Sequence, residues 1–483
     1  MNMSQKPLSE SLLEIEEIDQ ANNVVATYIR SQSGEKGERI DIAVPKNGNS
    51  YAKSVLNAFL PAGYPHSVTN DYFEYQVYDS LQAFSSSIAG MLSSRAVLEG
   101  IGVGDSHASP TAALLLSVLQ ESMGRIATIL FAHRLGTSLE PECKMYRLAA
   151  DVFNDAAMIL DCLSPAFPKA SRVALLSLSS VLRSLCGVAA GSSKASLSAH
   201  FATQGNLGEL NAKDSSQETV ISLLGMLVGS IVVSHITSKT ATWTALLFLL
   251  AIHLGTNYLA VKAVCMRTIN RQRANLIFSS VLDQVSAAAE QVPEVKKRSK
   301  SWSPVPDEMK WPEPETVMLQ ERVFERDGVL RWKGQVLGYC KLGVDLGSVI
   351  KCFSQGNSLT GSQVSDTAYT LSQLFELFKY EKYIVWYDER RRTFLVVLED
   401  GADTCDMLSA WMFALWFAKN GKLPGKSLLE AMDCTAAYIR SIDRRIFQRL
   451  GELDWDLDTG ALETRSGVRI KRPENLKMEW PGR

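Results

Sequence analysis

Three polar residues in one apolar stretch are the first candidates for chemistry. Asp151, Asn154 and Asp155 lie where the spacing of apolar residues predicts a helix. Residues three and four apart share a helical face, so at least two of these side chains point the same way. They could line a polar path between helices, or they could form structural ion pairs with Arg147 and Arg125. The sequence leaves both alternatives open.

The other residue types that commonly carry catalysis show no known arrangement. The six histidines have neither H-x-x-x-H nor H-E-x-x-H spacing, so no metal site is predicted. The sequence contains neither the G-x-S-x-G motif of hydrolases nor the complete G-x-x-x-x-G-K-[ST] loop of nucleoside triphosphatases. The glycine-rich residues 100–104 follow no predicted strand, so we interpret them as a loop between helices. We therefore predict no catalytic residues.

The stretch that must position such side chains runs from residue 206 to residue 273. It contains an apolar run at residues 220–233, a polar break, and a second apolar run at residues 243–263. The two runs predict a helical hairpin. The first run would be about 21 Å long as a helix, which is shorter than the hydrocarbon core of a bilayer. We favour a hairpin in or against a lipid bilayer, with a buried hairpin in a soluble core as the alternative.

Short motifs predict where the first helix begins and what it contacts. The spacing of Ser215 and Glu218 fits a capping box, which predicts a helix start near Ser216. Gly225 and Gly229 form a G-x-x-x-G pair, which lets a second helix approach closely. We expect that neighbour to be the helix predicted at residues 111–135.

Polar residues in and beside the two apolar runs are further candidates for interior groups. They are Lys213, Asp214, His253 and Asn257. Polar side chains in lipid usually face a bundle interior or a cavity, because desolvation without a partner is costly. Basic residues flank the end of the second run and predict that this end faces the cytoplasm or an equivalent compartment. They are Lys262, Arg267, Arg271 and Arg273.

Composition and charge exclude several classes of protein. The formal net charge is −2 over 483 residues, so no overall field favours nucleic acid. The eight cysteines form no C-x-x-C motif, which indicates a reducing compartment without a disulfide framework. The first 50 residues contain no apolar signal region and are acidic, so we expect neither a secretory signal nor a transit peptide. The expected location is an intracellular membrane.

The pattern of apolar residues predicts a mainly α, membrane-associated N-terminal domain and a smaller C-terminal α+β domain. We divide the chain into a variable segment at residues 1–50, a helical domain at 51–290, a proline-rich linker at 291–315 and the α+β domain at 316–483. Within the first segment we expect a short amphipathic helix in residues 8–25.

Predicted strands identify the α+β domain. Residues 317–324 and 329–339 alternate around Asp327-Gly328, which predicts a hairpin turn there. Residues 383–387 and 393–398 predict a second hairpin, and helices are expected from Asp403 and from Lys426.

The helical domain also shows signs of an internal duplication. Paired prolines at residues 61–65 are similar to those at 165–168, and several residues of 117–126 match residues 222–231 at one constant offset. The matches predict repeats at residues 61–161 and 165–283, with an insertion in the second copy. Paired helical repeats are typical of transporters, whose sites lie at the repeat interface.

Several of these segments resemble the root UVB sensitive (RUS) family. The resemblance is carried by residues 59–65, 71–84, 102–104, 144–161, 164–168, 213–218 and 270–273. It implies an intracellular, often membrane-associated protein. In plants it implies roles in UV-B responses and vitamin B6 homeostasis, plastid location and pairing between family members. It provides no catalytic residues, and because the chain has no transit-like leader we do not expect plastid targeting.

The vitamin link raises one cofactor hypothesis. Lys194 or Lys213 could form a Schiff base with a B6 vitamer such as pyridoxal phosphate, or each could instead cap or solvate a helix end.

The sequence leaves three hypotheses for the function. The first is a membrane-associated carrier or sensor of a small metabolite. The second is a soluble or peripheral scaffold that works as a homo-oligomer or with another family member. The third is an unrecognised enzyme.

Overall fold

A computed structural model describes most of the chain. The described residues are 14–18, 24–32, 38–43, 59–101, 109–291, 305–306, 308–354, 367–421, 425–464 and 467–472. The chain divides into two compact units. The first unit comprises Met1–Leu92 and Leu197–His253, and the second comprises Ser93–Ser196 and Leu254–Arg483. Three helices begin in one unit and end in the other.

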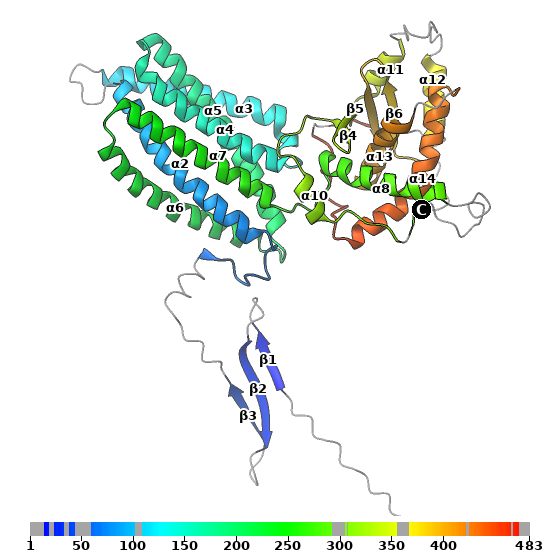
Figure 1. Ribbon diagram of the computed structural model, residues 1–483, viewed down its shortest axis with the longest axis horizontal. Coiled ribbons are helices and arrows are strands. Elements are labelled where there is room, and N and C mark those ends of the chain that lie inside the picture. The colour runs from blue at the N-terminus through cyan, green and yellow to red at the C-terminus, as the bar shows by residue number, and fades with distance from the viewer. Residues whose placement is uncertain are drawn as a thin grey trace, which may run out of the picture. The chain divides into compact units, whose positions relative to one another are not determined.

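The predicted fold class is confirmed, because an N-terminal helical region precedes a smaller region that contains a mixed sheet (Figure 1). The helices of the first region are long. They are α2 (Tyr72–Ile101), α3 (Pro110–Leu135), α4 (Cys143–Leu163), α5 (Lys169–Phe201), α6 (Leu207–His235) and α7 (Lys239–Ala263). The polar break of the predicted hairpin is the short connection between α6 and α7.

The element order bears on the proposed duplication. Three helices, α2 to α4, are followed by three more, α5 to α7, of comparable length. The insertion, predicted near residues 235–243, falls on the end of α6, the short connection at 236–238 and the start of α7. The end of the second predicted repeat falls within α8 (Arg271–Gln291), which packs elsewhere, as described below. The duplication therefore stays a prediction. The predicted repeats end at residues 161 and 283 and so match α4 with α8, whereas the order of the helices matches α4 with α7.

Residues 14–18, 24–32 and 38–43 form an antiparallel sheet, so the helix expected in residues 8–25 is wrong in the part that the structure describes. The strands are β1 (Glu14–Ile18), β2 (Val24–Gln32) and β3 (Glu38–Ala43), in the order β1-β2-β3. Isoleucine alternates with charged residues along β3, and β2 is rich in β-branched and aromatic residues. Both patterns fit a pleated strand better than a helix.

Helix α6 begins nearer the N-terminus than the capping box predicts. Its first residue is Leu207, and Asn206 precedes it. Ser216 and Thr219 lie inside the helix, where their hydroxyls donate to the carbonyls of Ala212 and Ser215 at 2.9 and 2.7 Å. Such bonds to the preceding turn satisfy the hydroxyls without ending the helix. The polar opening is therefore helical as well.

The G-x-x-x-G pair does form a packing seam, but with a different neighbour from the one expected. Gly225 and Gly229 are buried against α2 within the first unit. A Cβ on Gly225 would lie 2.7 Å from Ser87 Cβ. Gly124, on the helix that we expected as the partner, instead packs against Ser180 and Ser184 of α5. The glycine spacing predicted a close approach, but it carries no information on which helix approaches.

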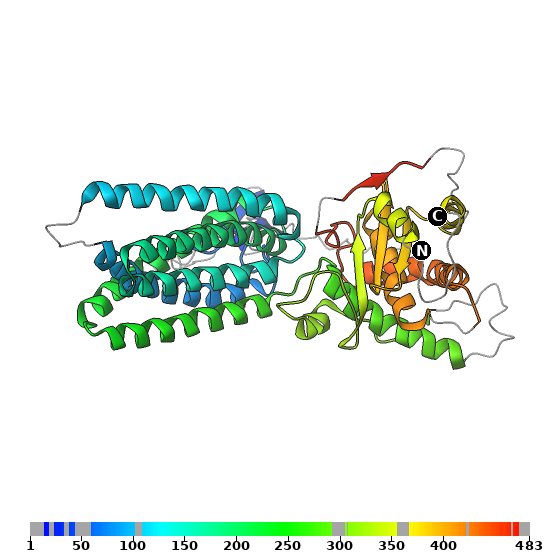
Figure 2. The ribbon, with the colours of Figure 1, turned by 90° about the horizontal axis from the view of Figure 1, so that it is seen from above.

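Four helices in the described residues are long and apolar enough to cross a membrane. The spans are Leu114–Ser138, Lys169–Phe201, Leu207–His235 and Lys239–Ala263, and 6% to 33% of their most apolar windows is buried. Figure 2 shows α3 at the edge of the helices of its unit, in agreement with its low burial. Large apolar side chains are correspondingly exposed along α3, among them Leu114, Val118 and Ile129.

The C-terminal region is built on a five-stranded mixed sheet in the second unit. Its strands are β4 (Val329–Trp332), β5 (Gln335–Leu342), β6 (Tyr383–Asp388), β7 (Thr393–Glu399) and β8 (Arg469–Ile470). The order is β4-β5-β7-β6, with β8 paired to the end of β7. Only the β5–β7 and β7–β8 pairs are parallel. The predicted hairpin of β6 and β7 is confirmed.

Helices cover this sheet and complete its core. They are α10 (Pro314–Gln320), α11 (Leu346–Ser354), α12 (Thr367–Leu377), α13 (Thr404–Asn420) and α14 (Leu428–Glu452). Figure 1 shows α8 and α13 beside β4 and β5. Phe278 of α8 and Trp411 of α13 are fully buried in one core with the strands. Thus residues 271–291, which the sequence placed in the helical domain, belong to the C-terminal core, and most of the predicted linker after them lies outside the described residues.

Two local predictions in this region are wrong. Residues 314–320 are helical rather than a strand, because Pro314 occupies the first helical turn, where its missing N–H costs nothing. The β4–β5 hairpin turns at Lys333-Gly334, where both residues have positive φ of 44° and 86°, as a type I′ turn requires. Gly328 also has a positive φ, but a Cβ there would meet Cys340 O at 2.5 Å, so this glycine permits a close approach rather than the turn.

Candidate functional site

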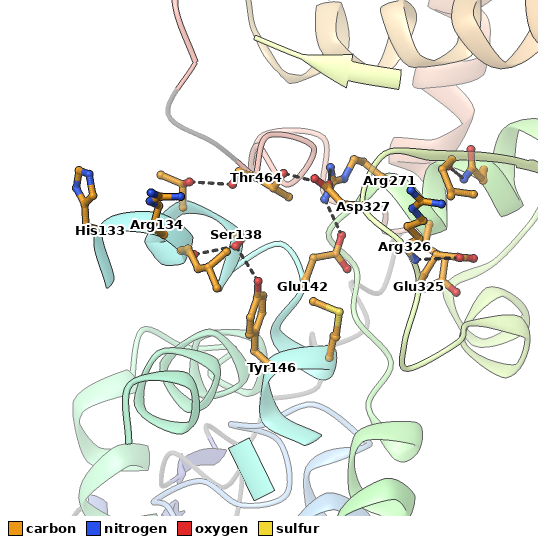
Figure 3. A pocket seen from close by; sticks show the side chains of 16 residues that line it. His133, Arg134, Ser138, Glu142, Tyr146, Arg271, Glu325, Arg326, Asp327 and Thr464 are labelled. Carbon is orange, nitrogen blue, oxygen red and sulfur yellow. Dashed lines mark hydrogen bonds and ion pairs between the residues drawn. The ribbon is translucent and has the colours of Figure 1, made fainter. Parts of the chain in front are cut away.

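A cavity with convergent polar side chains lies within the second unit. Its volume is about 520 Å³. The end of α3, the turn after it, the start of α4, the start of α8 and residues 325–329 surround it (Figure 3). The lining residues are His133, Arg134, Leu135, Thr137, Ser138, Glu142, Met145, Tyr146, Arg271, Gln272, Asn275, Glu325, Arg326, Asp327, Val329 and Thr464.

The turn after α3 shapes one wall of the cavity. Helix α3 ends at Leu135 and continues into a 3-10 turn, η2 (Gly136–Ser138). Ser138 Oγ lies 3.0 Å from the hydroxyl of Tyr146 on α4, and Thr137 Oγ1 donates to the Thr464 carbonyl at 2.9 Å. These bonds join the end of α3 to α4 and to the C-terminal region. The wall is therefore held by hydroxyl groups rather than by apolar packing alone.

Arg271 is the central charge of the cavity. Its guanidinium donates to Asp327 and lies 3.4 Å from Glu142 Oε1. Asn270 Nδ2 also donates to Glu142, at 3.3 Å. Burial raises the pKa of Glu142 above its ordinary value, because the nearby arginines and Asn270 do not fully replace the lost hydration. Glu142 is thus a half-buried carboxyl, 16% exposed, that lines the cavity.

The other charged side chains of the lining differ in how they are paired. Arg331 contacts both oxygens of Glu325, at 2.8 and 2.9 Å. Burial of Glu325 would raise its pKa, but the hydrogen bonds from Arg331 and from the Arg326 backbone prevail and lower it. Arg326 donates to Tyr339 Oη at 2.8 Å, with its guanidinium 4.8 Å from the centre of that ring. Arg134 is exposed at the end of α3.

A buried ion triad lies beside the cavity, close to Glu142. Glu321 accepts from Lys144 and from Arg273, each at 2.5 Å, and all three side chains are less than a tenth exposed. Burial works to raise the pKa of Glu321, but the two cations outweigh it and lower the pKa. Because Lys144 lies in the first turn of α4 and Arg273 in the first turn of α8, this triad fixes the two helices against the segment that follows α10.

The polar residues predicted on α4 lie elsewhere in the second unit. Asp151 pairs with Arg147 at 3.2 Å and accepts from the Asn257 amide of α7. Asp155 is buried and Asn154 is half-buried, whereas Arg125 contacts Glu121 on the helix surface. Asp151 therefore shows the structural pairing with Arg147 that we considered, and the predicted pairing with Arg125 is wrong.

The remaining predicted interior residues lie in the first unit. Asp214 is buried and accepts from Gln76 Nε2 at 2.8 Å, and His253 Nε2 lies 2.7 Å from Gln82 Nε2. Lys213 is half-buried on α6. Lys194, half-buried on α5, belongs to the second unit. Neither lysine lines the cavity, and no group of three or more histidine, cysteine and acidic residues suited to a metal occurs in the described part of the chain.

None of the residues that we selected as site candidates lines the cavity. The sequence did contain one signal, because the segment 270–273 carries part of the family resemblance and includes Arg271, which was predicted only as a basic flank of the second apolar run. Arg271 and Gln272 of this segment line the cavity. Lining residues come from positions 133 to 464, and no local pattern could show that these positions meet.

Comparisons with known proteins give the family. A family model described as a vitamin B6 photo-protection and homoeostasis domain matches residues 45–285. RUS family member 1 of Dictyostelium discoideum is 42% identical over 267 residues, which are 54% of this chain and 51% of that protein. Protein root UVB sensitive 3 of Arabidopsis thaliana is 38% identical over 48% of this chain and 52% of that protein.

The chain thus spans about half the length of the curated relatives that it matches. A chloroplastic relative, protein root UVB sensitive 2 of Arabidopsis thaliana, is 28% identical over 48% of this chain and 52% of that protein. No solved structure matches the chain. The match over residues 45–285, together with these relatives, shows that the chain belongs to the root UVB sensitive family.

Proposed function

We propose that the chain is a membrane-embedded protein that holds or senses a small metabolite without converting it, within vitamin B6 homeostasis. One observation carries the membrane part of this proposal. Four long apolar helices bury no more than 33% of their most apolar windows inside the protein. A large continuous apolar surface in contact with water is unfavourable and marks an interaction with a membrane or a partner.

Helix α3 exposes large apolar side chains along its length. Leu114, Leu115, Val118, Ile126 and Ile129 are all more than half exposed. Exposed apolar surface costs about 25 cal/mol per Å² relative to an apolar environment, so one such helix leaves several kcal/mol unrealised in water. Acyl chains would cover these side chains over the full length of the helix.

The interior of the second unit fits the same environment. Asp161 pairs with Arg183 at 2.5 Å and accepts from Ser93 at 3.0 Å, and Asp151 pairs with Arg147. Charged groups at membrane depth are tolerated when they face the protein interior and are paired. Asp151 and Asp161 of α4 satisfy both conditions, which supports helices that present apolar groups outward and polar groups inward.

The metabolite part rests on the cavity and on the family. Cavities of about 300–1,000 Å³ are typical of small-molecule sites, and the cavity beside Arg271 has about 520 Å³. The matching family model is described by vitamin B6 photo-protection and homoeostasis, which makes a B6 vitamer the first ligand to test. Because Lys194 and Lys213 lie outside the cavity, the proposal needs no Schiff base with either of them.

Membrane fractionation tests the first part. The full chain should stay in the pellet after sodium carbonate extraction at high pH and should enter solution with a mild detergent. Recovery in the carbonate supernatant would contradict embedding and would favour the oligomeric scaffold, in which a second copy or another family member covers the apolar helices. The sedimentation of that soluble form would then show a defined oligomer.

Ligand binding tests the second part. Detergent-purified protein should quench or shift the fluorescence of pyridoxal, pyridoxine or pyridoxal phosphate, and chromatography after incubation should recover the vitamer unchanged. A new product would contradict the non-enzymatic role. Absence of binding by all three vitamers would contradict the assignment of the metabolite.

A further inference from the structure

Not all charged side chains that line the cavity form ion pairs. Its three acidic side chains, Glu142, Glu325 and Asp327, each contact an arginine. The guanidinium groups of two lining arginines, Arg134 and Arg326, form no ion pair with a carboxylate among the residues that the structure describes. The Arg326 backbone N–H donates to Glu325 at 3.1 Å, but its guanidinium contacts the neutral Tyr339 side chain, and Arg134 is exposed at the end of α3. Two guanidinium groups thus remain available at the cavity.

We propose that this cavity binds the phosphate group of a small organic phosphate, with Arg134 and Arg326 as its cationic ligands. The inference rests on the proposed function, because it names the chemical group by which the metabolite is held. Arginine suits this role, since its planar guanidinium donates two parallel hydrogen bonds to phosphate oxygens. The volume of about 520 Å³ leaves room for an organic remainder beside the phosphate.

The first turn of α4 adds to the preference for an anion. Glu142, Met145 and Tyr146 line the cavity, so the N-terminal end of this helix borders it. The N-terminus of a helix presents unpaired N–H groups and a partial positive charge, which favour a bound anion. Ser138 and Tyr146 add hydroxyl groups that could donate to phosphate oxygens.

Glu142 couples binding to protons. The groups that act on it are Arg271 and Arg273, which favour its charged form, and Glu321, which disfavours it, while Asn270 donates to it. A phosphate beside Arg271 would weaken the interaction of Arg271 with the Glu142 carboxylate. It would also place a second negative charge near Glu142. Binding should therefore favour the protonated carboxyl, so Glu142 takes up a proton when the phosphate binds.

The phosphate could be free or could belong to a lipid. Arg134 follows directly on the apolar part of the candidate span Leu114–Ser138. If that span lies in a bilayer, its basic end lies at the level of the lipid headgroups. The chemistry of recognition is the same for both sources, and the experiment has one arm for each.

The test uses the full chain purified in a neutral detergent. Calorimetry would measure binding of glycerol 3-phosphate, with glycerol as the uncharged control, in two buffers of different ionisation enthalpy. The second arm would measure association with phosphatidylcholine vesicles with and without phosphatidic acid, whose headgroup is also a phosphate monoester. The variants are Arg134→Gln and Arg326→Gln. Arg267→Gln is the matched control, because Arg267 is exposed and does not line this cavity.

We expect each cavity variant to weaken binding at least tenfold, which is about 1.4 kcal/mol, in the arm that shows binding, because each variant removes a charge-assisted hydrogen bond to phosphate. Arg267→Gln should bind as the unsubstituted chain does, and Arg134→Lys should recover part of the loss. Proton uptake should disappear in Glu142→Gln. An unchanged melting temperature would show that Arg134→Gln is folded, as expected for an exposed side chain.

Absence of binding in both arms would overturn the inference. So would binding that the cavity variants and the control weaken equally, because surface charge would then explain it. These outcomes are independent of the membrane proposal. A chain that resists carbonate extraction but binds no phosphate refutes only the ligand assignment, and a carbonate-soluble chain that binds phosphate refutes only the embedding.

Discussion

A single methyl group on Gly225 tests the helix seam of the first unit. An alanine Cβ there would lie 2.7 Å from Ser87 Cβ and 2.9 Å from the Phe84 carbonyl oxygen of α2. The second of these atoms belongs to the main chain, so α2 itself must shift to make room. At Gly229 the nearest atom is Met91 Cγ at 3.0 Å, and a flexible methionine side chain can move aside at lower cost.

The size of the effect follows from two opposing contributions. Alanine in place of glycine in a helix interior stabilises by about 1 kcal/mol. Overpacking of a close contact costs about 1–3 kcal/mol. We therefore expect Gly225→Ala to destabilise by about 1 kcal/mol and Gly229→Ala to be close to neutral. Gly90 lies in α2 with nothing within 4 Å of the added Cβ, so Gly90→Ala should stabilise.

The assay compares these variants in the same detergent by the fraction that remains monodisperse on size-exclusion chromatography after heating. Gly90→Ala should survive the highest temperature and Gly225→Ala a lower one than the unsubstituted chain. Gly229→Leu, whose side chain would also meet Ile88 Cα, should lose most of its stability or expression. Leu227→Ala, at an exposed position, should keep its oligomeric size. If Gly225→Ala tolerates heat as well as Gly90→Ala does, the close approach to α2 does not exist.

Three further predictions concern the second unit. Glu321→Gln leaves Lys144 and Arg273 buried without their anion and should destabilise by about 3–5 kcal/mol, measured by denaturant unfolding. Folding raises the pKa of Glu142, so its contribution to stability is present below its unfolded pKa and is lost as pH rises through the folded one. Unfolding between pH 4 and 8 should show this loss, and Glu142→Gln should abolish it. Ser427→Ala removes the capping box of α14 and should cost about 1 kcal/mol in the same unfolding assay, whereas an unchanged midpoint would contradict that role.

Elements with a strong local signal could be predicted from the sequence. The break between α6 and α7, the β6–β7 hairpin and the capped start of α13 all follow from patterns within a few residues. The β4–β5 turn could not be predicted in this way. Asp327-Gly328 is the stronger hairpin signal, but the positive φ of Gly328 serves a close approach to Cys340, a contact that local sequence does not reveal.

The candidate site was missed for a related reason. Polar residues inside apolar helices attract attention because they are costly there, yet the cost only requires a partner. Asp151 and Asp214 find theirs in Arg147 and Gln76, and neither lies at the cavity. The cavity instead uses charged residues at helix ends and in connections, where charge is unremarkable. Their function depends on which of them remain without a carboxylate, and only the three-dimensional pairing decides that.

The basic residues in the last turn of α7 and after it show this dependence most clearly. In the sequence alone, these residues predict a positively charged flank of a membrane helix. In the structure Lys262 Nζ donates to the Glu321 carbonyl at 2.8 Å, at the C-terminal end of α10. Arg271 and Arg273 pair with Asp327 and Glu321. These cations therefore fix α7 and α8 to the C-terminal region and have little charge left for lipid headgroups. A positive-inside argument for orientation should then rest on exposed cations such as Arg134 and Arg267.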